Sequence, residues 1–193
     1  MKFSAITKLA AIIITVLLSA TAGAQLKFAE VFSDNMVLQR DKPVTIWGNS
    51  IAGTQVIVQF ATQQKETFAD TAGKWKVVFE PFKLSAIPQN LTAVSGNQPV
   101  LTLKNILVGD VWLCSGQSNM EYTFDRKLKK YAAPKKGVDE ALEELTKPKP
   151  GGIRYLYVEK NLNKVPVLPV KGWTDGNDTL VRYASAIGYF FAK

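Results

Sequence analysis

Apolar and polar residues alternate in several short stretches between residues 25 and 108. In 56–60, 75–79 and 101–103, apolar residues recur at every second position, which is typical of a strand with one buried face. Turn residues separate these stretches, for example at 71–73. Short strands at this spacing predict a small β-sandwich over residues 25–108.

The hydrophobic period changes in residues 109–193. A short apolar run at 111–115 and an alternating run at 153–158 predict two strands. Apolar residues at helical spacing follow each of them, around 138–145 and 180–191. Strand, helix, strand, helix is the order of a parallel α/β domain. Because parallel sheets normally contain more than two strands, we expect only the first part of such a domain.

The first residues of the chain predict a signal peptide. Lys2 and Lys8 give a positive start, the uncharged stretch 9–18 follows, and small residues at 22–24 fit a signal peptidase site. The apolar run is shorter than the roughly 20 residues of a membrane-spanning helix. We therefore expect residues 1–24 to be removed, and the mature protein to be exported to the periplasm or the extracellular space without membrane contact after cleavage.

Composition narrows the chemistry that the chain can complete. It has 193 residues, 47% of them hydrophobic, a formal net charge of +8, one cysteine and no histidine. Because histidine is absent, a Ser-His-Asp triad, a histidine general base and most zinc sites cannot be completed within this chain. Cys114 lies in an apolar run, so we expect a buried core residue. No carboxylate pair or oxygen-rich loop suggests a metal, and we expect no cofactor.

A polar turn with candidate chemistry follows the predicted strand 111–115. Gly116 permits a sharp turn, and Ser118 would lie at the carboxyl end of a parallel strand, where open α/β sheets bind ligands. If a helical turn starts at Ser118, its backbone N–H groups can stabilise an oxyanion. The spacing differs from the G-x-S-x-G elbow, because residue 120 is Met.

The longer context of this turn resembles a known family. Residues 109–120 resemble the first sequence block of the SGNH hydrolases and, more narrowly, of the sialate O-acetylesterase family. Other segments match the pattern of that family, including its N-terminal β domain: 32–40, Pro43, Trp47, Gly48, 153–155, Trp173 and 185–191. The resemblance implies that residues 109–193 begin a flavodoxin-like, three-layer α/β domain of the SGNH type.

The resemblance also implies a function and its residues. The family removes acetyl groups from sugar hydroxyls, including those of sialic acids. Ser118 is then the nucleophile and a backbone oxyanion donor, and Gln117 and Asn119 are expected to contact the substrate. The family's histidine base and further oxyanion donors come from later blocks, which no position of this chain matches. We therefore expect an incomplete esterase, inactive alone, whose base comes from a missing C-terminal segment or a second chain.

Two other interpretations of the chain stay open at this stage. A lysine base from Lys127, Lys129 or Lys130 is disfavoured, because it would need burial and these residues lie in the dense cationic run 126–136. That run is typical of a solvated loop, or it steers anionic sugars toward Ser118; export disfavours nucleic acid. The alternative function is a non-catalytic, secreted glycan-binding or interaction module. Three tryptophans would then stack on sugar rings: Trp47, Trp75 and Trp112.

Overall fold

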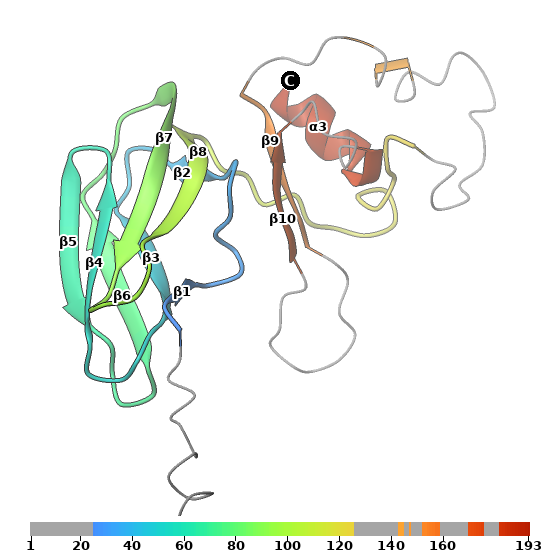
Figure 1. Cartoon of the computed structure of the whole chain (residues 1–193). Coiled ribbons are helices and arrows are strands. Elements are labelled where there is room, and N and C mark those ends of the chain that lie inside the picture. The colour runs from blue at the N-terminus through green and yellow to red at the C-terminus, as the bar shows by residue number, and fades with distance from the viewer. Residues whose placement is uncertain (1–24, 126–142, 145–146, 148–151, 159–169, 176–181) are drawn as a thin grey trace, which may run out of the picture.

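The computed structural model describes residues 25–125, 143–144, 147, 152–158, 170–175 and 182–193 (Figure 1). Its elements, in chain order, are β1 (Lys27–Phe28), β2 (Val37–Gln39), β3 (Val44–Asn49), β4 (Gln55–Phe60), β5 (Gln63–Phe68), β6 (Lys74–Phe79), β7 (Ser85–Val94), β8 (Leu101–Gly109), β9 (Arg154–Val158), β10 (Val170–Asp175) and α3 (Ala186–Ala192). The predicted signal peptide, the cationic run 126–136 and most of the predicted helix at 138–145 lie outside the described residues.

Most of the described structure is β. One sheet has the strand order β2-β8-β7-β4-β5 and the other the order β1-β3-β6. The pairings within both sheets are antiparallel except that of β2 with β8, which is parallel. Figure 1 shows β3 and β6 beside the larger sheet, which curls toward them. A mostly β structure is therefore confirmed, whereas its closer description as a β-sandwich stays a prediction.

The alternation seen in the sequence places one face of each strand in a common core. In β4, Val56, Val58 and Phe60 are fully buried, while Gln55 and Gln59 are exposed. Residues of both sheets form this core, among them Leu38, Ile46, Val58, Phe60, Trp75, Phe79, Leu91 and Ile106. Trp75 is only 3% exposed, so it is a core residue, as is usual for an aromatic residue at strand spacing, and the open alternative that it stacks on sugar rings is excluded.

The rest of the described structure is smaller. β9 and β10 pair antiparallel, with an irregularity between Val170 and Trp173. The helix α3 begins after Ser185, whose Oγ accepts the N–H of Gly188 at 3.3 Å. Within the described parts of 109–193, no two strands are parallel. A flavodoxin-like domain is therefore not confirmed, and the domain boundary at 108/109 stays a prediction.

The prediction of a buried strand at 111–115 is wrong. These residues adopt no strand, Leu113 is 91% exposed, and Cys114 is exposed rather than part of the core. After the end of β8, residues 111–115 pair with no strand among the described residues, so their backbone is part of no sheet. Part of its apolar character serves contacts with α3, because the Trp112 ring packs edge-on against Phe191 with centroids 5.2 Å apart.

Arg154 connects β9 to the larger β structure. Its Nη1 donates to Asn35 Oδ1 at 3.3 Å, and its Nη2 donates to Asn105 Oδ1 at 3.2 Å. Asn105 Nδ2 also donates to Asn35 Oδ1, at 2.7 Å. The φ angles of Asn35 and Asn105 are 67° and 59°, in the left-handed region that asparagine tolerates better than most residues. The guanidinium therefore bridges two segments that lie 70 positions apart in the sequence.

Trp173 makes a second connection from β10. Its backbone N–H donates to Ser33 Oγ at 2.7 Å, and its indole Nε1 donates to Val31 O at 3.0 Å. The ring also packs against the core of the larger β structure. Together with the Arg154 bridge, these contacts join β9 and β10 to the segment around residues 31–35.

Candidate active site

The segment that carries Ser118 folds into a tight turn. Three successive backbone hydrogen bonds define it, from Met120 N to Gln117 O at 2.9 Å, from Glu121 N to Ser118 O at 3.1 Å and from Tyr122 N to Asn119 O at 3.2 Å. Each closes a loop of the i to i+3 type, as in a 3₁₀ helix. Gln117, Ser118 and Asn119 are all exposed on this turn. Ser118 therefore lies within a run of tight turns.

The first N–H groups of this turn are free to receive an anion. Among the described residues, no acceptor takes the backbone N–H of Ser118 or Asn119, and Ser118 Oγ has no hydrogen-bond partner there either. Such N–H groups carry the positive end of the peptide dipoles. The turn thus combines an exposed hydroxyl with donors on the same residues, which is the chemistry that an oxyanion requires.

Gly116 allows the turn to close on itself. A Cβ at this position would lie 2.9 Å from Met120 Cγ, which is too close for an ordinary contact. Met120 in turn faces Ser185, whose Oγ donates weakly to the Met120 sulfur at 3.9 Å. The glycine before Gln117 is therefore needed for the close approach of the Met120 side chain, which folds back over the start of the turn.

The chain enters this turn from a fixed point at the end of β8. Arg40 N donates to Gly109 O at 2.9 Å, and the side chain of Arg40 binds Asp110 through Nε at 2.9 Å. Gln39 Oε1 accepts the N–H of Val111, also at 2.9 Å. The hydrogen bond from Arg40 lowers the pKa of the Asp110 carboxyl. Residues 39–40 thus orient the first residues of the segment that leads to Ser118.

The chain leaves the turn along the beginning of α3. Thr123 and Ser185 form an antiparallel bridge. On either side of it, Ala186 N donates to Tyr122 O at 2.9 Å and Phe124 N donates to Ala184 O at 3.3 Å. Below them, a small core contains Phe124, Ala184, Ala186 and Tyr189. The chain is therefore held by residues distant in sequence at 109–111, before the Ser118 turn, and at 122–124, directly after it.

A charged cluster at the end of α3 ties the helix to residue 144. Tyr189 Oη donates to Glu144 Oε1 at 2.9 Å, and Lys193 Nζ donates to the same oxygen at 2.7 Å. The hydrogen bond from Lys193, helped by those from Tyr189 and Lys147, lowers the pKa of Glu144 to about 2. Burial, with the adjoining carboxylate, raises the pKa of Tyr189 to about 12. Nothing in the sequence pattern indicated this cluster.

Acid is expected to loosen this cluster. The pKa of Glu144 falls from 4.5 to about 2 on folding, so its stabilising effect is complete above about pH 4.5 and is lost as the pH falls toward 2. In urea unfolding, the stability advantage of the native chain over Glu144→Gln should therefore shrink between about pH 5 and pH 2.5. An advantage that stays constant over this range would contradict the prediction.

Two segments beside the turn expose large apolar side chains. In 111–113, Trp112 is 64% exposed and Leu113 is 91% exposed. In α3, the exposed apolar residues are Ile187, Phe190 and Phe191. Contiguous exposed apolar surface usually marks a contact with other protein. No helix in the described part of the chain is long and apolar enough to cross a membrane.

The structure keeps the three predicted site residues Gln117, Ser118 and Asn119 on one turn but adds no base to them. Lys127, Lys129 and Lys130 lie outside the described residues. Over the described ranges, no group of three or more carboxylate or cysteine side chains is arranged to hold a metal ion. The described part of this turn therefore presents an exposed serine hydroxyl and backbone N–H groups without acceptors.

Comparison with solved structures indicates the class of protein. A carbohydrate acetylesterase from Xanthomonas citri matches with a TM-score of 0.74 and 26% sequence identity, over 86% of this chain and 36% of that one. This similarity supports an esterase function of the carbohydrate esterase class. No family model matches the chain.

Comparison of sequences indicates the family. The sialate O-acetylesterase of Rattus norvegicus is 34% identical over 114 residues, and that of Homo sapiens is 34% identical over 116 residues. These alignments cover 54% and 53% of this chain and 21% of each relative. Both comparisons support the sialate O-acetylesterase family, as the motifs around Ser118 predicted. The chain spans about one fifth of the length of these curated relatives.

Proposed function

We propose that the chain carries the nucleophile of a carbohydrate O-acetylesterase that acts on acetylated sugars, sialic acids included. The observation that carries this proposal is the Ser118 turn, where an exposed hydroxyl stands beside two backbone N–H groups without acceptors in the described structure. The sialate O-acetylesterase relatives and the carbohydrate acetylesterase neighbour support the substrate class. Gln117 and Asn119 flank the hydroxyl and are proposed to contact the sugar.

The proposed reaction proceeds in two steps. Ser118 Oγ attacks the acetyl carbonyl while a base takes its proton, and the N–H groups of Ser118 and Asn119 stabilise the oxyanion. The bond from the carbonyl carbon to the sugar oxygen breaks, and the sugar leaves as an alcohol after it takes up the proton. Water then attacks the acetyl group on Ser118 and releases acetate, which restores the serine.

The base is proposed to come from a group outside these 193 residues. The chain contains no histidine, and a serine hydroxyl without a neighbouring base is a poor nucleophile. The exposed apolar side chains of 111–113 and α3 lie beside the turn and offer a surface for a further segment of the protein or a second chain. We propose export to the periplasm or the extracellular space on the basis of residues 1–24.

Chemical rescue tests this proposal on the chain itself. Imidazole supplies the missing base in solution, and a positioned base contributes about 10²–10⁴ to a rate. With tens of millimolar imidazole, a fluorophosphonate should modify Ser118 at least about tenfold faster than without imidazole. Mass spectrometry of peptides locates the adduct and measures its rate of formation.

The matched controls separate a reactive serine from an accessible one. Ser118→Ala should abolish the imidazole-dependent adduct, while Ser115→Ala, which removes another exposed serine of the same segment, should leave it unchanged. Equal modification of Ser115 and Ser118 would show that exposure alone decides the reaction. A chain that stays inert with imidazole would favour the non-catalytic module.

A further inference from the structure

The outer face of the small sheet combines one aromatic ring with several cations. Its strands pair so that Trp47 of β3 lies opposite Lys76 of β6, and Asn49 lies opposite Lys74. Residues at these positions point away from the core, as the burial patterns of β3 and β6 show. Trp47 is 42% exposed, which leaves part of its side chain open to solvent on the strand paired with that of Lys76.

No carboxylate neutralises the two lysines of this face. Lys74 and Lys76 form no ion pair among the described residues. The outward positions of β1, β3 and β6 are Lys27, Thr45, Trp47, Asn49, Lys74, Lys76 and Val78. None of these side chains is acidic and three of them are lysines, so the charged groups of the face are all cationic.

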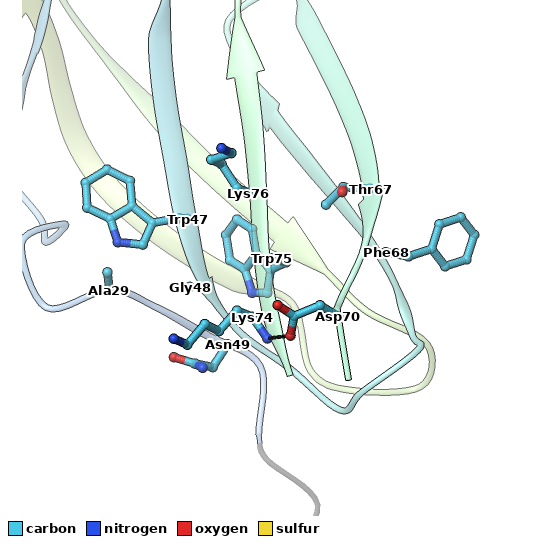
Figure 2. Close-up of a pocket in the computed structure, with 10 residues that line it drawn as sticks. All are labelled: Ala29, Trp47, Gly48, Asn49, Thr67, Phe68, Asp70, Lys74, Trp75 and Lys76. Carbon is cyan, nitrogen blue, oxygen red and sulfur yellow. Dashed lines mark hydrogen bonds between the residues drawn. The ribbon is translucent and has the colours of Figure 1, made fainter. Parts of the chain in front are cut away.

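The face borders a hollow. A cavity of about 610 Å³ is lined by residues of β3, β5 and β6, among them Trp47, Asn49, Lys74 and Lys76. Figure 2 shows Asn49 and Lys74 side by side near the edge, with Phe68 directed away from them. The Asp70 carboxylate at the rim accepts the backbone N–H groups of Ala72 and Lys74, both through Oδ1.

We propose that this hollow binds a carbohydrate that carries a carboxylate, at a site separate from the Ser118 turn. The apolar face of a sugar ring packs on the exposed part of the Trp47 indole. The sugar carboxylate accepts hydrogen bonds from the Lys76 and Lys74 ammonium groups, and Asn49 serves hydroxyl groups as both donor and acceptor.

The arrangement favours an acidic sugar over other anions and over neutral sugars. A free inorganic phosphate would use the charges but would leave the Trp47 ring without a saturated ring to cover it. A neutral sugar would leave Lys74 and Lys76 without a counter-charge. The site requires no chemistry from Ser118, so it can hold a glycan near the protein whether or not the chain completes an esterase.

Titration of the full chain with sialyllactose and with lactose tests the proposal. The two probes differ by one acidic sugar, and calorimetry or protein NMR measures binding of each. Sialyllactose should bind at least about tenfold more tightly than lactose, and its affinity should fall when salt rises from about 20 to 500 mM. Equal affinity for the two probes, or no binding of sialyllactose, would overturn the proposal.

Variants locate the site. Trp47→Ala and the double variant Lys74→Gln/Lys76→Gln should each weaken sialyllactose binding by about tenfold, and only the double variant should also remove the salt dependence. Lys42→Gln, at an exposed lysine outside this sheet face, should bind like the native chain. Because Trp47 also packs on Phe32, with ring centroids 4.5 Å apart, the lysine variants test the site without touching that packing. Unchanged binding by the double lysine variant would refute it.

Discussion

Replacing Arg154 by Met is expected to loosen the β9–β10 pair from the larger β structure and to cost about 2–3 kcal/mol of stability. A hydrogen bond to a charged group contributes about 1.5–3 kcal/mol when its partner is removed and a polar atom is left unsatisfied. Arg154 makes two such bonds, to Asn35 Oδ1 and Asn105 Oδ1. Asn105 Nδ2 still reaches Asn35 in the variant, which limits the loss.

Hydrogen exchange and tryptophan fluorescence measure this effect. Amides of β9 and β10 should exchange faster in Arg154→Met, and the emission of Trp173, which packs on the larger core, should shift toward that of an exposed indole. Arg154→Lys keeps the charge but loses the planar guanidinium group. Its exchange rates and Trp173 emission should therefore lie between those of the native chain and those of Arg154→Met. Lys42→Met, a cation-to-Met change at an exposed site, should have no effect. Native exchange rates in Arg154→Met would show that Trp173 alone holds the pair.

Gly48→Ala is expected to destabilise the chain by about 2–4 kcal/mol, as substitutions that force backbone shifts in a packed region do. A Cβ at this position would lie 2.0 Å from the carbonyl oxygen of Lys27 and 2.8 Å from the Trp75 ring. Moving either neighbour costs free energy, because the Lys27 oxygen belongs to the backbone of the paired strand β1 and the Trp75 ring is buried. Strand β1 would have to separate from β3 and expose Phe28.

Gly53→Ala provides the matched control for backbone strain. Its φ is 73°, and a Cβ there meets no atom within 4 Å, so only the left-handed conformation is penalised, by about 1 kcal/mol. Urea unfolding of both variants compares the two costs, and exchange at residues 26–28 reports on β1. A loss in Gly48→Ala no larger than that in Gly53→Ala would mean that β1 moves aside without consequence.

The β part of the chain was predictable because its information is local. Alternation in β4 and β6 placed Val56, Val58, Trp75 and Phe79 inside, since successive side chains of a strand point to opposite faces. Strand β5 was not found, because Gln63–Phe68 has no buried residue and shows no apolar alternation. It is recognised only by its pairing with β4.

The apolar run 111–115 shows where the local pattern fails. A short apolar run does not distinguish a strand in a sheet from an irregular segment against a helix. The structure shows the irregular segment: the Trp112 ring packs against Phe191, and Cys114 Sγ lies close to Gly188 of α3. No strand pairs with this run in the described part of the chain, and Cys114 is exposed there.

The sequence by itself determined the strands with alternating faces, the absence of an internal histidine and the turn at Ser118, because each depends on residues close together in the chain. It also indicated the sialate O-acetylesterase family. Only the tertiary structure decided how the motif segments meet. The bridge from Arg154 to Asn35 and Asn105, the cluster around Glu144 and the cationic face beside Trp47 join residues from distant segments. Packing, which depends on the whole fold, brings such residues together, so no local pattern reveals them.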